Sequence, residues 1–191
     1  MTPLAISLKE WAVVQRSLLE GHQILLLRKG GIVEETGDFA LEADTALIFP
    51  TYAHEDERKG DLQPCFQQWL REEEDKKPHD GFLRLESFIH VTDVIPVPDR
   101  ERLLVLSPQH IWSPQFIHGR YDWEPYKPIF ALLVRAWALP SAVEVLAKKE
   151  YGGCRSWITL GTPVEVAAAV PVLSDEHYER RRVLTKSILQ K

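Results

Sequence analysis

The sequence predicts a single α+β domain, in which helices at both ends and in the crossovers flank a mixed or antiparallel central sheet. First, 45% of the 191 residues are hydrophobic and 27% are charged, which is the balance of an ordinary globular protein. Second, helix start signals occur near both ends of the chain, and short apolar runs typical of strands lie between them. Third, no Gly-rich, Ser-rich or Pro-rich linker divides the chain, so we expect residues 1–191 to form one domain.

The first predicted element is a helix at Leu8–Glu20. Ser7 and Glu10 have the spacing of a capping box, and apolar residues recur after them at helical intervals. Gly21 can adopt the left-handed conformation that ends a helix. We therefore expect the chain to open with a helix.

Five further segments are predicted to be strands. A short run that is apolar on all sides is typical of a buried strand, whereas alternation of apolar and polar residues is typical of a half-buried one. Pro50 and Pro140 are expected to end two of the strands, because Pro cannot donate a ladder hydrogen bond. The predicted strands are Gln23–Leu27, Ala46–Phe49, Phe82–Val91, Lys127–Leu139 as a central strand, and Cys154–Leu160.

The remaining helices are predicted from residues that can cap a helix. Asp, Ser and Thr accept hydrogen bonds from the first free N–H groups of a helix, and Pro favours its first turn. The predicted caps are Asp61 for a helix that carries Leu62, Phe66, Trp69 and Leu70 on one face, Ser107 and Ser113 for two short helical turns, Thr162 with Glu165 as a second capping box, and Ser174 for the last helix.

Charge is unevenly divided along the chain. The formal net charge is −5 at pH 7, with −8 in residues 1–100 and +3 in residues 101–191. A net acidic protein is a poor candidate for strong binding to nucleic acid of any sequence, because such binding depends on Lys and Arg contacts with phosphates. The basic second half still leaves room for a local anion-binding face.

The sequence also indicates where in the cell the protein is expected. Cys65 and Cys154 lie far apart and lack CxxC spacing, so we expect two thiols rather than a disulfide scaffold or a zinc site. No apolar run approaches the ~18 residues of a membrane helix, and the start of the sequence lacks the features of a signal peptide. We therefore expect a cytoplasmic protein without a membrane partner. The chain contains no Asn, one Met and 13 Pro, which favours a thermostable protein from a thermophilic source.

The first candidate site is the segment that follows the predicted strand ALIF. Thr51, Tyr52 and His54 offer a hydroxyl, a phenol and an imidazole at a strand end, where side chains often project into a cleft. Arg28 and Lys29 follow the preceding predicted strand, and they would add two cations if the two strands pair. The alternative is an ordinary turn in which Tyr52 packs against the protein and His54 is exposed.

The second candidate site is the segment HIWSPQFIHGRYDWEPYKP. Trp112 and Trp123 alternate there with Arg120 and Lys127, and aromatic rings among cations are what stacking a base and holding its phosphate require. The alternative is that the aromatic rings cap the core. The His and acidic residues of this segment lack a recognised metal-ligand spacing, and no nucleotide-loop or hydrolase signature occurs in the chain. We therefore expect neither a metal nor a cofactor.

The C-terminal segment contains three consecutive arginines. Successive residues of a helix point about 100° apart, so the arginines cannot form one compact patch. Arg182 and Lys186 lie four residues apart and can form one basic stripe on the last helix.

Several sequence blocks carry a resemblance. The blocks LKEWAVVQRSLLEGHQILLLRKGGI, FPTYAHE, HIW with RYDWEPYKPIF, and EYGGCRSW resemble an uncharacterised bacterial family of domains of unknown function that is well represented in cyanobacteria. This resemblance implies one conserved domain and assigns no catalytic residue. The order of the predicted elements is also distantly similar to PUA-like barrels that bind RNA or modified bases, which implies a partly open barrel.

Three functional hypotheses follow. The first is a domain that binds a nucleotide or nucleic acid against Tyr52, Trp112 and Trp123, with the phosphate held by cations of both candidate sites. The second is a metal-dependent hydrolase or nuclease that uses His54 with Glu55 or Asp56. The third is a protein–protein interaction module with exposed aromatic residues. The sequence does not indicate the oligomeric state. The first hypothesis requires the two candidate sites to meet in space.

Overall fold

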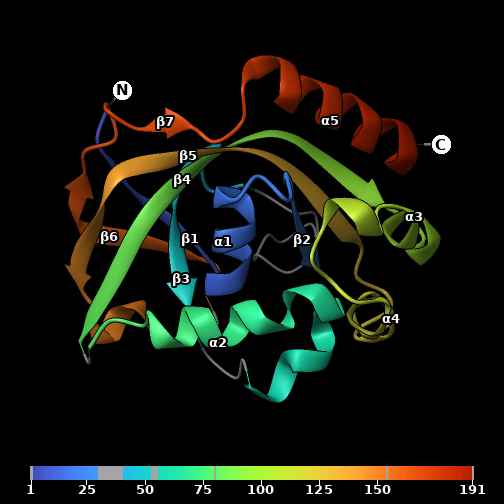
Figure 1. The fold of residues 1–191 in the computed structure, drawn as a ribbon, viewed down its shortest axis with the longest axis horizontal. Coiled ribbons are helices and arrows are strands. Elements are labelled where there is room, and N and C mark those ends of the chain that lie inside the picture. The colour runs from blue at the N-terminus through green and yellow to red at the C-terminus, as the bar shows by residue number, and fades with distance from the viewer. Residues whose placement is uncertain (1, 30–40, 53–55, 80, 154, 191) are drawn as a thin grey trace.

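The computed structural model describes residues 2–29, 41–52, 56–79, 81–153 and 155–190. These residues form one strongly curved sheet of seven strands that wraps around helix α1 (Figure 1). The strand order is β2-β5-β4-β3-β1-β6, and β7 pairs with β5. The β1–β3 pair is parallel and the other pairs are antiparallel, so the predicted α+β class with a mixed sheet is confirmed.

The bounds of the elements are as follows. The strands are β1 Leu4–Trp11, β2 Leu25–Lys29, β3 Thr45–Thr51, β4 Phe82–Val97, β5 Ile129–Leu146, β6 Trp157–Val164 and β7 Val170–Pro171. The α-helices are α1 Ala12–Leu19, α2 Gln67–Asp75, α3 Arg100–Val105, α4 Pro114–Asp122 and α5 Asp175–Leu189. Short 3-10 helices occupy Asp56–Asp61, Pro64–Phe66, Ser107–Gln109 and Lys149–Tyr151.

The predicted start of the first helix at Leu8 is wrong. Residues 4–11 form strand β1, and α1 begins only at Ala12. β1 pairs with β3 on one side and with β6 on the other, so two hydrogen-bonded ladders outweigh the local capping signal. Ser7 is fully buried in this strand, and Gly21 ends α1 with φ +67°, as predicted.

Two prolines do not end their strands. Pro50 lies within β3, opposite Glu10 of the parallel strand β1. Pro140 lies within β5 in an irregular segment, where the pairing with β4 moves from Ala138 to Val143. A proline is tolerated there because a bulge residue does not have to donate to the neighbouring strand.

Two of the predicted helix caps are correct, and one predicted helix is wrong. Ser113 and Ser174 cap α4 and α5, and each side-chain oxygen accepts a hydrogen bond from a backbone N–H three residues later. The helix predicted at Thr162 is wrong, because residues 162–164 continue β6, where Val164 pairs with Leu4.

The core has two parts, one on each face of the sheet. In β3, Ala46 and Ile48 pack in the larger cluster with α1, whereas Leu47 and Phe49 pack in a smaller cluster with residues of β6. This alternation is the period-two pattern of a strand buried on both faces.

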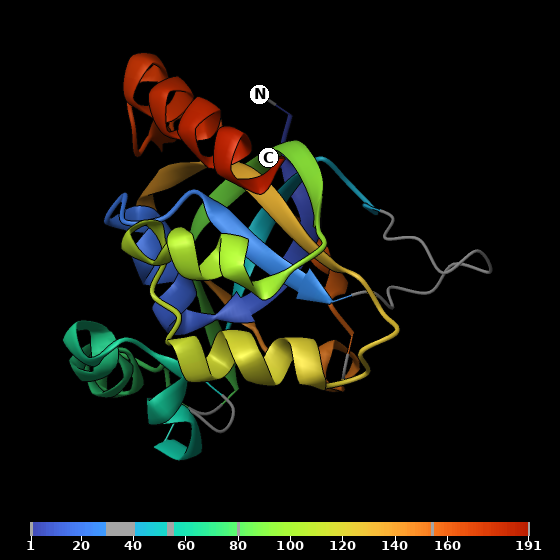
Figure 2. The ribbon, with the colours of Figure 1, turned by 90° about the vertical axis from the view of Figure 1, so that its right-hand side faces the viewer.

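The helices cover different sides of the sheet. α5 lies across the top of the molecule in the view of Figure 1, and α2 lies at the opposite end. α3 and α4 lie beside β2, as Figure 2 shows from the side. Within the described residues, no helix combines the length and the apolar character needed to cross a membrane.

Candidate functional site

The ends of β1, β2 and β3 meet around Glu10. The strands that carry Arg28 and Thr51 do not pair, since β5 and β4 lie between β2 and β3 in the sheet order. Curvature of the sheet nevertheless brings these residues together. Arg28 Nη2 donates to Glu10 Oε2 (2.7 Å) and to the carbonyl of Lys9 (2.9 Å), and Thr51 Oγ1 donates to the carbonyl of Glu10 (3.2 Å).

The charges of this strand-end group, Glu10, Arg28 and Thr51, are largely withdrawn from solvent. The side chains of Arg28 and Glu10 are 17% and 10% exposed, so this ion pair is poorly screened. Tyr52 is half-buried beside the group, with the Lys77 ammonium 5.9 Å from its ring centre. His54, and with it the hydrolase or nuclease hypothesis, lies outside the described residues.

Lys29 connects β2 to α4. Lys29 is 9% exposed, and its ammonium donates to the carbonyls of Tyr121 (3.0 Å) and Arg120. These carbonyls belong to the last turn of α4, where the helix dipole favours a cation. Burial lowers the pKa of Lys29, and the nearby charge of Arg120 lowers it further. Lys29 thus fixes the end of α4 against the sheet.

An aromatic series runs from the sheet to the surface of α4. The Trp11 and Trp112 rings meet edge to face with centres 5.4 Å apart, and Trp112 stacks on Phe116 at 4.1 Å. The Arg120 guanidinium then lies 5.8 Å from the Phe116 ring and 5.7 Å from the Trp123 ring. Trp112 is only 5% exposed and caps the core, as the alternative interpretation predicted, whereas Trp123 is 54% exposed.

A hollow of about 510 Å³ opens beside this series, and we call it the α4 hollow. Gly119 lies on its wall, and a Cβ atom at that position would meet no atom within 4 Å. This volume is within the range of small-molecule sites. The hollow is lined by Asp61, Gln115, Phe116, Gly119, Arg120 and Trp123.

The chain before α2 forms the far wall of the hollow. Ser113 Oγ donates to the carbonyl of Gly60 (2.7 Å), and the backbone N–H of Ser113 donates to the carbonyl of Asp61 (2.8 Å). These two bonds hold Asp61 beside the first turn of α4. The sequence predicts Asp61 as a helix cap, but α2 begins only at Gln67, and no sequence signal indicates that Asp61 lines a hollow.

Lys127 belongs to the turn that follows α4. Its ammonium donates to Glu124 Oε2 (2.9 Å), and Tyr126 donates to Glu124 Oε1 (3.1 Å). The hydrogen bond from Lys127 lowers the pKa of Glu124 and raises that of Lys127. Glu124 has φ +46°, a left-handed conformation that is uncommon for a residue other than glycine.

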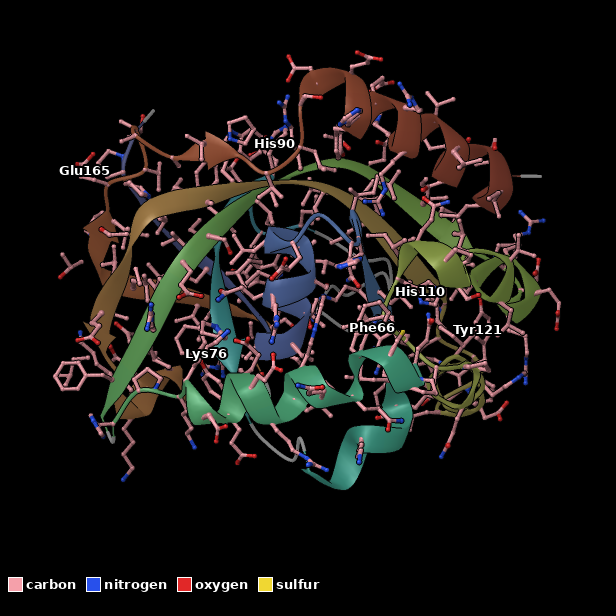
Figure 3. The ribbon with its side chains drawn as sticks, viewed as in Figure 1. Phe66, Lys76, His90, His110, Tyr121 and Glu165 are labelled. Atoms are coloured by element: carbon pink, nitrogen blue, oxygen red, sulfur yellow. The ribbon has the colours of Figure 1, made fainter. Side chains whose placement is uncertain are left out.

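Two other members of the second candidate segment serve the fold. His110 is 2% exposed, its Nε2 bonds to the carbonyl of Leu103, and burial lowers its pKa. The Tyr121 hydroxyl donates to the carbonyls of Val97 and Asp99, and burial raises its pKa. Figure 3 shows both side chains on the side of the molecule that carries α3 and α4.

The His and acidic side chains of this segment pair with other groups and do not gather around a common point. His118 Nδ1 and Asp122 Oδ1 each lie 3.0 Å from the Arg100 guanidinium. No group of three or more His, Cys, Asp or Glu side chains suitable for a metal occurs in the part of the chain that the structure describes.

The two candidate segments meet at one end of the sheet. Trp11 lies opposite Thr51 in the β1–β3 register, and its ring contacts Trp112, which stacks on Phe116 in α4. The strand-end group and the α4 hollow are therefore connected through packed aromatic rings. The hollow itself contains two of the predicted ligand-binding residues, Arg120 and Trp123.

The fold and this site define an α+β domain with an open, curved mixed sheet and a hollow beside a surface helix. The family model described as "Domain of unknown function (DUF1802)" matches residues 7–183, so the chain belongs to this family. The resemblance to a family of domains of unknown function is thereby confirmed. Comparison with curated proteins gives no match.

One solved structure is similar to this chain. It is the crystal structure of a mutant of the ZmASCH protein from Zymomonas mobilis, with 12% sequence identity and a TM-score of 0.41. The similarity covers 78% of this chain and 93% of that chain.

Proposed function

We propose that the protein binds a nucleotide unit, a base with its phosphate, in the α4 hollow. The unit can be free or part of a single strand, because both present the same base and phosphate chemistry. The observation that carries the proposal is the exposed Trp123 ring beside the Arg120 guanidinium, at the edge of a hollow of about 510 Å³.

The aromatic surface accounts for binding of the base. Stacking of a base on an aromatic side chain contributes about 1–3 kcal/mol, and an arginine beside the ring adds a cation–π contribution. Trp123 is 54% exposed, so its ring is open to a ligand without any rearrangement of the core. Phe116 and the buried Trp112 stack behind this surface and support it.

Arg120 is the residue that we assign to the phosphate. Its guanidinium presents several N–H donors in one plane, which suits phosphate oxygens. Lys29 holds the backbone of Arg120 in place from below. With only one or two such contacts, the affinity should depend weakly on salt concentration. Few phosphate contacts are what we expect of a chain whose net charge is −5.

The test is titration by fluorescence anisotropy of fluorescein-labelled single-stranded RNA and DNA oligonucleotides, with unlabelled mononucleotides as competitors. We expect Trp123→Ala and Arg120→Ala each to weaken binding by about tenfold or more. Arg120→Ala should also reduce the salt slope by about one.

Matched controls come from elements that do not line the α4 hollow. Phe82→Ala removes an aromatic ring that is 48% exposed at the start of β4, and Arg180→Ala removes an exposed arginine from α5. Neither should change the affinity. Wild-type affinity in both hollow variants, or absence of binding by every probe, would refute the proposal.

A further inference from the structure

We propose that the α4 hollow selects guanine and that Asp61 determines this specificity. The inference rests on the proposed function, since it names which base the same hollow takes. It is carried by the presence of a carboxylate residue, Asp61, in the lining of the same hollow as the exposed Trp123 ring.

The two ends of the hollow carry different chemistry. Asp61 and Gln115 lie at the first turn of α4, whereas Arg120 and Trp123 come from its end. Gly119 lies on the wall between them, where the absence of a side chain leaves open space. In this proposal, a base over Gly119 and against Trp123 presents an edge to the end of the hollow that Asp61 and Gln115 line.

Asp61 is held in this position by its backbone. Its carbonyl accepts the Ser113 N–H, and the preceding carbonyl of Gly60 accepts the Ser113 hydroxyl. Ser113 Oγ also caps α4 by accepting the N–H of Phe116 (3.1 Å). The position of Asp61 is therefore fixed by the same residue that starts the helix, and a change of its side chain leaves these bonds intact.

The chemistry of a carboxylate distinguishes the four bases. An ionised Asp only accepts hydrogen bonds, and its two oxygens have about four lone-pair positions to offer. The contact that Asp61 already makes within the protein therefore does not by itself exhaust its capacity. Guanine presents two adjacent donors, N1–H and the N2 amino group, which match the two oxygens of one carboxylate. Such bonds to a charged acceptor are about twice as strong as neutral ones.

The other bases present a mismatch to Asp61. Adenine and cytosine each place a ring-nitrogen acceptor beside their amino donor, and uracil flanks its single N3–H with two carbonyl oxygens. A carboxylate oxygen facing any of these acceptors is repelled, and an unpaired polar group in a closed contact is costly. The NH₂ group of Gln115, which lines the same end, can in addition donate to O6 of guanine.

The experiment is competition of GMP, IMP, AMP, CMP and UMP against a labelled oligonucleotide, with the wild type and with Asp61→Asn. In the wild type we expect GMP to compete about tenfold or more better than AMP, CMP and UMP, since a bidentate contact discriminates by about this amount. IMP lacks the N2 amino group, so it should be intermediate. In Asp61→Asn the advantage of GMP over IMP should fall to about twofold or less.

Asp122→Asn is the matched control. It removes the same charge from the last residue of α4, where the side chain is 65% exposed and paired with Arg100. This variant should keep the wild-type order of nucleotides. Trp123→Ala should weaken all five competitors by a similar factor, because stacking tolerates every base.

The outcomes separate the two proposals. Equal competition by all nucleotides in the wild type overturns the guanine inference and leaves nucleotide binding intact. A guanine preference that survives in Asp61→Asn overturns the role of Asp61. Failure of every nucleotide and oligonucleotide to bind overturns both the inference and the proposed function.

Discussion

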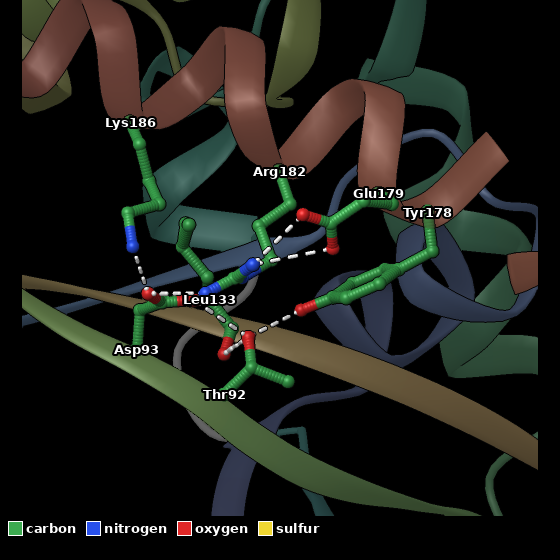
Figure 4. A network of polar contacts seen from close by, with 7 residues as sticks. All are labelled: Thr92, Asp93, Leu133, Tyr178, Glu179, Arg182 and Lys186. Carbon is green, nitrogen blue, oxygen red and sulfur yellow. Dashed lines mark hydrogen bonds and ion pairs between the residues drawn. The ribbon is translucent and has the colours of Figure 1, made fainter. Parts of the chain in front are cut away.

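One largely buried carboxylate, Asp93, joins two basic residues of α5 to strand β4 (Figure 4). Asp93 lies in β4 with its side chain 10% exposed. Arg182 donates to both of its oxygens, and Lys186 donates to Oδ1. The basic stripe predicted at Arg182 and Lys186 therefore faces Asp93. Replacement of Asp93 by Asn keeps the shape of the side chain and removes the charge that attracts both cations.

The size of the effect follows from the pKa of Asp93. Burial alone would raise this pKa, but hydrogen bonds from Arg182, Lys186 and Thr92 outweigh burial and lower it from 3.8 to about 2. Each tenfold change in proton affinity corresponds to about 1.4 kcal/mol, so ionised Asp93 contributes about 2 kcal/mol to the free energy of unfolding. Asp93→Asn should remove about this amount at pH 7.

The dependence on pH has a definite sign. Because the pKa in the folded state lies below that of the unfolded chain, the stabilisation is fully present above about pH 4. It is lost as the pH falls through the folded-state value of about 2. The difference in stability between the wild type and Asp93→Asn should thus be constant from pH 7 to about 5 and shrink toward pH 2.

Urea unfolding followed by circular dichroism, at pH 7, 5, 3.5 and 2.5, measures this difference. The control is Asp175→Asn, since Asp175 also pairs with an arginine, Arg135, but is 87% exposed. We expect the control to cost less than about 1 kcal/mol at every pH. The reasoning would be refuted if the loss in Asp93→Asn were the same at pH 7 and pH 2.5, or if both variants lost equally at pH 7.

Two further predictions concern the surroundings of the α4 hollow. Trp112→Ala should lower the free energy of unfolding by about 3–5 kcal/mol, because the ring is buried, whereas Trp123→Ala should cost less than about 1 kcal/mol. Urea unfolding compares the two variants, and equal losses would contradict the assignment of one ring to the core and the other to the surface. Glu124→Gly should leave the midpoint of thermal unfolding nearly unchanged, because relief of the left-handed backbone at φ +46° offsets the lost bond to Lys127. A clear fall in the midpoint would show that the ion pair outweighs the backbone strain.

Local chemistry explains which elements were predictable from the sequence. The Ser113 and Ser174 caps depend only on the few residues that follow them, so the helices α4 and α5 start where the sequence indicates. Apolar runs such as Gln23–Leu27 were recognisable as strands because they are too short for a helix and lack a polar face.

The capping box at Ser7 shows the limit of local signals. The spacing of Ser7 and Glu10 suits a helix, and nothing within those residues shows that two other strands will pair with them. Both strands come from distant parts of the chain, and their ladders convert the segment into β1. Glu10 then loses its expected capping role and becomes the partner of Arg28.

The sequence points to some residues that lie together here, such as Arg120 and Trp123, but neither to Asp61 nor to the assembly of these residues in space. Arg28 and Thr51 meet although their strands do not pair, because the sheet curves far enough to bring the end of β2 to the end of β1. The curvature arises from twist accumulated over many strand pairs, which no short pattern encodes. A sequence can therefore indicate which side chains carry binding chemistry without showing the path that brings them together.

Lys29 illustrates how the fold and the site depend on the same contacts. A lysine at the end of a buried strand has to find acceptors for its ammonium, and here the acceptors are the carbonyls that end α4. The same turn of α4 carries Arg120 and leads directly to Trp123. Because its ammonium is buried against α4, Lys29 is not exposed to bind a phosphate directly. The same contact holds the turn that carries Arg120 and Trp123, the two residues that we assign to the nucleotide. In our proposal, Lys29 therefore positions these residues instead of binding the ligand.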